Sequence, residues 1–370
     1  MNLRAWHEQM TGTTQFAQPF GQQPLTNPPM LPSGQKMDDQ LRMAARLDWA
    51  RHALADADAR LTRASTDAGF RSYWRSNGQP SRIVMDSPPD KEDVRPWLRL
   101  RDVLDRGGVR VPQVLSRDVE SGFLLLEDLG RDTYLQVIAA DNADALFDAA
   151  ITQLLKLQAI APPDDLPVYD EALLARELHL FDEWFIGRHL GLSLTAADLE
   201  TLHRSYRQLI DAALAQPQVL VHRDFMPRNL MPAADGPAVL DFQDAVRGPI
   251  AYDALSLFKD AFLSWPQQRV DGWLGHYHAR ALAAGLPVPA LARFRRDADW
   301  IGVQRHLKVI GIFARLHHRD GKPKYLADVP RFFAYLDEVL PRYPELMPLA
   351  ELIDRVVKPA LSARETVAAP

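Results

Sequence analysis

The pattern of apolar residues in this chain changes character once, at Leu129-Gly130. Before that point, short runs rich in β-branched and aromatic residues are separated by turn signals such as Asn77-Gly78 and Ser121-Gly122, which are typical of antiparallel hairpins. The expected strands cover 61–66, 71–75, 83–86, 113–117 and 122–127. After that point, apolar residues recur at helical spacing. The pattern therefore predicts an α+β fold with a small antiparallel β lobe and a larger helical lobe.

We expect a helix that opens the ordered part of the chain and one helix inserted between the third and fourth strands of the β lobe. One covers 41–54, and the other covers 90–106, where it ends at the glycine stop Gly107-Gly108. In the second lobe, helical periods cover 143–160, 171–187, 196–215, 252–263, 271–284, 291–317 and 329–339, and only 219–242 reads as strand-like. We expect four parts: a tail over 1–36, a nucleotide-binding lobe over 37–126, a hinge over 127–130, and a catalytic and substrate lobe over 131–370.

The tail over 1–36 is rich in Gln, Pro, Thr and Gly, and such a composition buries too little apolar surface to offset its ordering entropy. We expect it to be disordered or foreign to the native protein, whose start would then be Met37. The absence of cysteine from all 370 residues excludes disulfide frameworks, thiolate metal sites and cysteine nucleophiles.

The net charge of -5 at pH 7 argues against nucleic-acid binding through a basic surface. The longest apolar runs fall well short of the roughly 20 residues that a membrane helix needs. We therefore expect a cytoplasmic protein with no nucleic-acid, membrane or protein partner.

Residues 219–243 carry the most informative polar pattern. An apolar run ends in His222-Arg223-Asp224, Asn229 follows five residues after that aspartate, and a second apolar run ends in Asp241. A hairpin over 230–240 would place Asn229 and Asp241 side by side at its open end, with Asp224 on the preceding loop.

Oxygen-bearing side chains in this arrangement suit phosphate chemistry. Mg²⁺ prefers oxygen ligands and is usually held by one or two protein groups plus substrate phosphates, as an Asn/Asp pair would allow. A neighbouring carboxylate can orient and deprotonate a hydroxyl. The alternative is a surface loop with unrelated polar residues, which the combined spacing, strand context and second acid disfavour.

The motif His-x-Asp-x-x-x-x-Asn, followed by Asp-Phe, resembles the catalytic and metal loops of kinases. The resemblance implies that Asp224 is the base that accepts the substrate hydroxyl proton. It also implies that Asn229 and Asp241 are the Mg²⁺ ligands, and that His222 is a structural residue bracing the metal loop.

The segment after Asp241 separates kinase classes. Residues 244–253 lead straight into a helix and leave no room for the peptide-docking segment of a protein kinase. The stretch ending in Ala251-Tyr252-Asp253 instead resembles the aminoglycoside phosphotransferase and choline kinase superfamily, whose members phosphorylate small hydroxyl compounds. In that superfamily the residue at Asp253 is expected to be a buried structural hydrogen-bond acceptor.

Four further pieces, at 66–75, 83–89, 124–130 and 304–313, resemble the bacterial anomeric amino-sugar kinases of this superfamily, and the similarity runs from about residue 40 to about residue 340. It implies ATP- and Mg²⁺-dependent phosphorylation of N-acetylmuramate and N-acetylglucosamine at C1, in cell-wall recycling. Two alternatives stay open: a kinase of another small alcohol, such as an aminoglycoside, choline or homoserine, and a nucleotide-binding pseudokinase.

The same resemblance implies the nucleotide contacts. The loop between the first two strands would place backbone N–H groups of Ala68, Gly69 and Phe70 over the ATP phosphates, and the backbone of Glu127 to Leu129 would bind adenine.

The strand lysine that protein kinases pair with the phosphates is absent from 82–86. Arg71 and Arg75 share one sheet face by their spacing, and we expect Arg71 to contact nucleotide. The alternative is two solvated arginines. Glu92 is given no role, because it has no lysine partner.

The helix over 300–317 combines an apolar stripe with an unusual number of cations. Arg305 and His306 are the predicted substrate-binding residues, because a cation there could meet the carboxylate of N-acetylmuramate. The alternative is a solvated helix face. His317 and His318 have no ligating partner four residues away, which disfavours a metal site.

Overall fold

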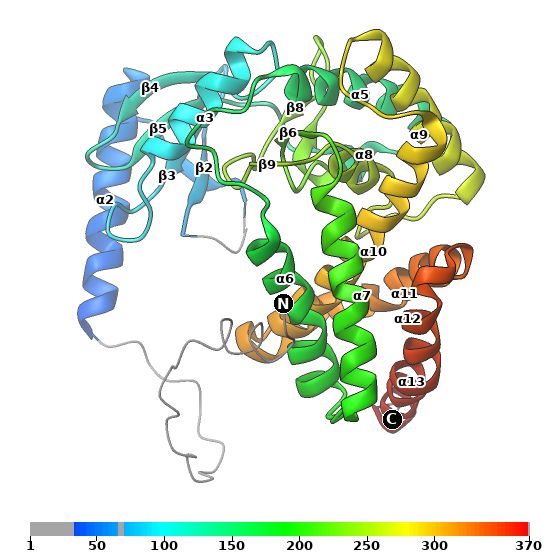
Figure 1. The fold of residues 1–370 in the computed structure, drawn as a ribbon. Helices are drawn as coiled ribbons and strands as arrows, with labels where there is room; N and C mark the ends of the chain where they lie inside the picture. The colour runs from blue at the N-terminus through cyan, green and yellow to red at the C-terminus, as the bar shows by residue number, and fades with distance from the viewer. Residues whose placement is uncertain (1–32, 66–69, 369–370) are drawn as a thin grey trace. The chain divides into compact units, whose positions relative to one another are not determined.

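The computed structural model describes residues 33–65 and 70–368 (Figure 1). The described residues divide into two units, with the boundary between Asp48 and Trp49. The first contributes the part of helix α2 (Ser33–Leu54) that precedes Trp49. The expected tail over 1–36 lies outside the described residues except for 33–36, which belong to α2.

A five-stranded sheet opens the second unit. Its strands follow the order β1-β2-β3-β5-β4, and every neighbouring pair is antiparallel, as the hairpin signals predicted. The strands are β1 (Leu61–Arg63), β2 (Ser72–Ser76), β3 (Arg82–Asp86), β4 (Val114–Asp118) and β5 (Phe123–Glu127). Helix α3 (Arg95–Arg106) lies between β3 and β4 and begins five residues later than predicted, because Pro96 is tolerated only in a first helical turn.

Alternation of side chains along the central strands gives the sheet two apolar faces. Met85, Leu124 and Leu126 belong to the main core, which also contains the buried face of α3. Val84 and Leu125 point the other way and pack with Ala50 and its neighbours from the end of α2. Both faces of the sheet are therefore covered by a helix.

The rest of the second unit is mainly helical, and helix α10 (Leu291–Asp320) packs against η1, α6, α7, α8 and α11. The approach of α10 to α6 is very close at Gly311, where a Cβ atom would lie 2.3 Å from the backbone carbon of Leu180. Besides α10, the described helices of more than three residues in this part of the chain are α4 (Tyr134–Val137), α5 (Ala143–Ala159), α6 (Glu171–Leu180), π-helix η1 (Phe181–His189), α7 (Ala196–Leu214), α8 (Ala251–Phe258), α9 (Gln267–Ala283), η3 (Pro323–Asp328), α11 (Val329–Val339), α12 (Met347–Leu352), η6 (Ile353–Val357) and α13 (Lys358–Ala368).

Helix α8 ends at Phe258, five residues earlier than predicted. Lys259 leaves the helical conformation, and the carboxylate of Asp260 accepts the backbone N–H of Phe262 at 3.3 Å. Such a local side-chain bond competes with continuation of the helix.

Two short pairs of strands interrupt the helices, and only one of the four strands lies outside the predicted strand-like region 219–242 by more than a residue. Strand β7 (Leu230–Met231) pairs with β8 (Ala238–Val239), which is the expected hairpin. Strand β6 (Gln218–Val221) pairs with β9 (Val246–Pro249), which was not predicted because its glycine and proline are poor strand formers.

The sheet and these helices belong to the same compact unit, so the division into lobes with a hinge at 127–130 stays a prediction. Within the described ranges, no helix has the length and apolar character needed to cross a membrane.

Candidate active site

The loop after β6 is fixed at its base by the buried carboxylate of Asp253. This side chain, in the first turn of α8, accepts the backbone N–H groups of His222 at 2.7 Å and of Arg223 at 3.0 Å. Burial raises the pKa of Asp253 to about 6, against the opposing effect of His222 and these two donors. Arg223 adopts a left-handed backbone conformation, with φ of 73°. The chain therefore turns sharply just before Asp224.

His222 joins this loop to the residue that precedes Asp241. Its Nε2 atom lies 2.8 Å from the carbonyl oxygen of Leu240, and its Nδ1 atom lies 3.2 Å from the backbone nitrogen of Asp224. Both contacts are satisfied when Nε2 carries the hydrogen and Nδ1 accepts, an assignment that rests on the hydrogen-bond network. One buried imidazole thus ties together the two acidic segments of the motif.

Asn229 makes a second link between the same segments. Its side-chain nitrogen donates to the carbonyl oxygen of Asp224 at 2.9 Å, and its own carbonyl accepts the backbone N–H of Leu240 at 2.9 Å. Because Asn229 directly precedes β7 and Asp241 follows β8 after one intervening residue, both stand at the open end of the hairpin. The structure therefore brings Asp224, Asn229 and Asp241 to one place.

Asp241 adopts a left-handed conformation with φ of 60°, which is rare for a residue other than glycine and is concentrated at functional sites. Its Oδ1 atom accepts from the side chain of Gln243 at 2.7 Å. Because the side-chain nitrogen of Asn229 donates to the carbonyl oxygen of Asp224, the side-chain oxygen of Asn229 is the atom available to bind a cation. An amide oxygen beside an exposed carboxylate is a donor set that fits Mg²⁺.

A buried ionic network that was not predicted holds Arg223. The guanidinium pairs with Glu177 of α6, and Lys308 of α10 lies 2.9 Å from the same carboxylate oxygen. Tyr169 and Gln304 donate to the other oxygen. Glu177 is only 5% exposed, so every contact to it is made away from solvent.

The charges in this network support one another. Burial alone would raise the pKa of Glu177, but Lys308 and Arg223 lower it to about 2. Burial would lower the pKa of Lys308, but Glu177 raises it above its ordinary value. Sequence periodicity assigned Lys308 to a basic helix face that could be solvated, and nothing in the sequence indicated its partner on α6.

The nucleotide-binding residues predicted near β2 are only partly described. Ala68 and Gly69 lie outside the described residues, and Phe70 is exposed. Arg71 donates through Nε to Glu92 at 3.1 Å, and a second guanidinium nitrogen lies 2.9 Å from the other carboxylate oxygen. Glu92, which was given no role because it had no lysine partner, is thus paired with an arginine. The remaining guanidinium nitrogen of Arg71 is buried without a hydrogen-bond partner among the described residues.

Arg75 is held differently from Arg71. Its guanidinium donates twice to Asp128, at 2.6 and 2.9 Å, and this contact raises its pKa. Glu127 accepts from Arg110, and Leu129 is half-buried. Arg75 is therefore engaged with the segment 127–130 and is a poorer candidate than Arg71 for binding phosphate.

Arg305 and His306, the predicted substrate-binding residues, are buried, with 2% and 1% exposure. Arg305 donates to the carbonyl of Lys259 at 3.2 Å, and His306 packs between the rings of Phe332 and Tyr335. Burial holds the pKa of His306 well below its ordinary value, so the ring is neutral near pH 7. The solvated helix face considered as an alternative is wrong for these residues and for Lys308, and a substrate contact stays a prediction.

Known proteins resemble this chain in sequence and in fold. Residues 60–295 match the model of the phosphotransferase enzyme family. Three similar proteins bear the name N-acetylmuramate/N-acetylglucosamine kinase. The one from Pseudomonas putida is 58% identical and covers 79% of this chain and 87% of its own. The one from Pseudomonas aeruginosa is 52% identical, and the match covers 80% of this chain and 88% of that protein. The one from Neisseria meningitidis serogroup B is 45% identical, and the match covers 84% of this chain and 94% of that protein.

Solved structures share the fold at low sequence identity. The ADP-bound aminoglycoside phosphotransferase APH(2″)-Ib matches with a TM-score of 0.55 and 17% identity, covering 79% of this chain and 97% of that one. The choline kinase LicA from Streptococcus pneumoniae matches with a TM-score of 0.54 and 12% identity, covering 82% of this chain and 99% of that one. These neighbours confirm the kinase-like α+β fold.

The Glu177 network generates a stability prediction. Glu177→Gln keeps the shape but leaves Arg223 and Lys308 without a counter-charge, so we expect the free energy of unfolding at pH 7 to fall by about 3 kcal/mol. A lowered pKa stabilises the fold above the unfolded value, and this contribution is lost as pH falls from about 4.5 towards about 2. The difference between the two proteins should shrink over that window in denaturant titrations.

The matched control is Glu200→Gln, which breaks an exposed pair with Arg204 on α7. Exposed pairs contribute about 0–1 kcal/mol, so this variant should unfold nearly like the wild type at each pH. Equal stability of the two variants would contradict the network's role.

Proposed function

The chain belongs to the phosphotransferase enzyme family, and we propose that it transfers the γ-phosphoryl group of ATP to the anomeric C1 hydroxyl of N-acetylmuramate and N-acetylglucosamine, in cell-wall recycling. The observation that carries this proposal is the identity of 45–58%, over at least 79% of the chain, to three kinases named for these sugars. The likeness to aminoglycoside and choline kinases supports the fold alone, so those acceptors are not favoured.

Asp224 is the proposed catalytic base. Its carboxylate orients the C1 hydroxyl and accepts the hydroxyl proton as the oxygen bonds to the γ-phosphorus and the bond from that phosphorus to ADP breaks. The loop that carries Asp224 is held by His222, Asn229 and Asp253. Since the transition state of phosphoryl transfer is loose, most of the catalysis consists of positioning.

Asn229 and Asp241 are the proposed Mg²⁺ ligands, through the side-chain oxygens that the hydrogen bonds described above leave available. When bound, Mg²⁺ neutralises the charge of the phosphates. The backbone ties on both sides of Leu240 hold Asp241 in its left-handed conformation, and this fixes the carboxylate in place.

Arg71 is the proposed phosphate-binding cation of the sheet. Glu92 engages one edge of the guanidinium through two nitrogens, and the third nitrogen stays without a partner among the described residues. A planar guanidinium can hold a carboxylate and a phosphate oxygen at the same time, because its donors point along fixed directions. In this proposal Glu92 acts as a positioning residue that aims Arg71.

The reaction product provides the most direct test. We expect ³¹P NMR of the reaction with N-acetylmuramate and MgATP to show a sugar phosphate coupled to the anomeric proton, and the same with N-acetylglucosamine. Aminoglycosides, choline and homoserine serve as comparison acceptors. Phosphate on another hydroxyl, or turnover with the comparison acceptors alone, would overturn the proposal, and nucleotide binding without any turnover would favour a pseudokinase.

Substitutions of Asp224 and Asp241 should have different effects on turnover and on ATP binding. Asp224→Ala should lower kcat by about 10²–10⁴-fold while ATP binding survives, because the base acts only in the transfer step. Asp241→Asn should instead remove the dependence of ATP affinity on Mg²⁺. Calorimetric titration of ATP with and without Mg²⁺ separates the two effects, and the exposed Asp164→Ala is the control. An Asp224→Ala variant with wild-type turnover is incompatible with this mechanism.

Arg71 should contribute to ATP affinity. Arg71→Met removes a charge-assisted contact worth about 1.5–3 kcal/mol, so we expect the KM for ATP to rise about 10–100-fold. Glu92→Gln should raise it less, since it only loosens the guanidinium. The control Arg95→Met breaks an exposed pair with Glu120 and should leave the KM for ATP unchanged. An unchanged KM in Arg71→Met would show that another cation serves the phosphates.

A further inference from the structure

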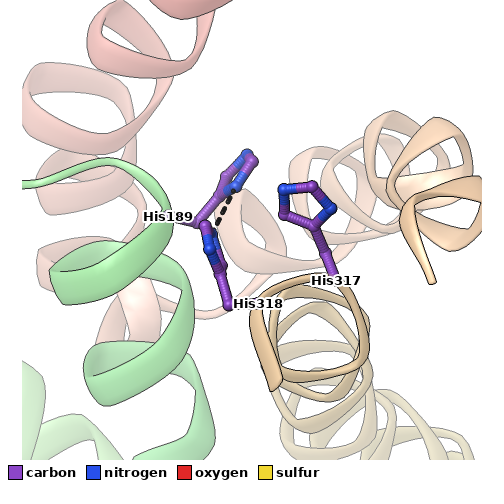
Figure 2. Close-up of side chains that lie close together, drawn as sticks. All are labelled: His189, His317 and His318. Atoms are coloured by element: carbon purple, nitrogen blue, oxygen red, sulfur yellow. Dashed lines mark hydrogen bonds between the residues drawn. The ribbon is translucent and has the colours of Figure 1, made fainter. Parts of the chain in front are cut away.

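Three histidines converge where two helices end (Figure 2). His189 is the last residue of η1, and His317 and His318 lie in the last turn of α10. We refer to these residues as the three-histidine cluster. One ring nitrogen from each lies within 4.8 Å of one from the other two. The partner that sequence reasoning found missing is supplied by a residue 129 positions away.

The spacing within the cluster matches metal coordination. The Nδ1 atom of His189 lies 3.3 Å from the Nε2 atom of His318. Zn–N bonds of about 2.0–2.1 Å in a tetrahedral site place neighbouring ligand atoms about 3.3 Å apart. These two nitrogens are hydrogen-bonded to each other, so an ion would take the place of the shared hydrogen. The rings of His189, His317 and His318 would turn toward the ion from positions in which their ligand atoms already lie within 4.8 Å of one another.

An unsatisfied polar atom in the cluster also supports a metal site. The Nδ1 atom of His317 is buried and has no hydrogen-bond partner among the described residues. His189 is 7% exposed, and its ring stacks on that of Phe185. The neutral form of imidazole is the one that binds metal ions.

The charges around the cluster act in both directions. Arg188 and Arg364 are two cations near His318, and Arg319 follows it directly on α10. Arg188 lies over the ring of Trp184 at 4.4 Å, and Arg364 is exposed and therefore screened by solvent. The carboxyl ends of two helices meet at the cluster, and each carries partial negative charge that favours a cation.

A second cluster, His179, Asp182 and His203, is a weaker candidate. Both carboxylate oxygens of Asp182 lie 3.2 Å from a nitrogen of His179, and one also accepts from the hydroxyl of Tyr206. The carboxylate is thus engaged by hydrogen-bonding partners, unlike the buried nitrogen of His317.

We propose that His189, His317 and His318 bind a divalent first-row transition-metal ion that prefers imidazole ligands, such as Zn²⁺. The ion would join the end of η1 to the end of α10, and three protein ligands would leave a fourth position for water. Mg²⁺ requires oxygen ligands and would not compete. The site is separate from the proposed kinase chemistry and does not depend on it.

The test is calorimetric titration of Zn²⁺ into the untagged, chelator-treated full-length protein in excess Mg²⁺. We expect a saturable Zn²⁺ site in the wild type. Loss of a residue that only supports a ligand weakens binding about 10–100-fold, so His317→Ala and His318→Ala should each weaken this site by at least about 100-fold. Co²⁺ should give the visible absorption of a tetrahedral nitrogen site in the wild type and not in these variants.

His203→Ala is the matched control, because it removes a histidine from the second cluster and should keep the Zn²⁺ site. Circular dichroism of metal-free His317→Ala and His318→Ala checks that both fold. The proposal is overturned if the wild type binds no Zn²⁺, if both cluster variants bind like the wild type, or if His203→Ala loses the site.

Discussion

A single buried carboxylate underlies the geometry of the candidate active site. Asp253 accepts two consecutive backbone N–H groups, from His222 and Arg223, while fully shielded from solvent. Desolvation penalises its charge, which is why its pKa is raised to about 6. The position of Asp253 in the first turn of α8 favours the carboxylate electrostatically, because the amino end of a helix carries partial positive charge. The loop that carries Asp224 is thus attached to α8 through its backbone.

The side chain of Arg223 connects the loop that carries Asp224 to helices α6 and α10. The residue turns the chain in a left-handed conformation, and its side chain reaches Glu177, which also pairs with Lys308. Helices α6 and α10 are therefore joined to the loop through one carboxylate. Removing water from these charges is costly, and the cost is offset only because the two oxygens of Glu177 are fully used by cations and hydrogen-bond donors.

The sequence was sufficient wherever the structure is governed by local patterns. The hairpins, the longer helices before residue 340 and the juxtaposition of Asn229 with Asp241 follow from turn residues and side-chain periodicity over a few positions. Helices α4 and η3 and the helices after Val339 were not predicted. Strand β9 escaped prediction because Gly248 and Pro249 disfavour strands, and its pairing with β6 compensates for that preference.

Contacts between distant segments could not be read from periodicity. Glu92 had no lysine partner in the strand, and its actual partner, Arg71, precedes a different strand. The same limit explains why the basic residues of α10 were taken as possibly solvated and why His317 and His318 were set aside as a metal site. The periodicity of a helix predicts which side chains share a face. The residues that this face contacts depend on tertiary packing, which periodicity does not predict.

Helix α10 shows how strongly packing decides the role of a charged side chain. Lys308 ends in an ionic network, His306 lies between aromatic rings, and His317 faces His189 at the end of another helix. Such close packing of α10 against α6 is possible because Gly311 has no Cβ to meet the backbone of Leu180. On α10, Gly311 lies between Lys308 and the histidine pair, and Leu180 lies between Glu177 of α6 and His189 of η1. The ion pair and the three-histidine cluster therefore lie on opposite sides of one close helix crossing.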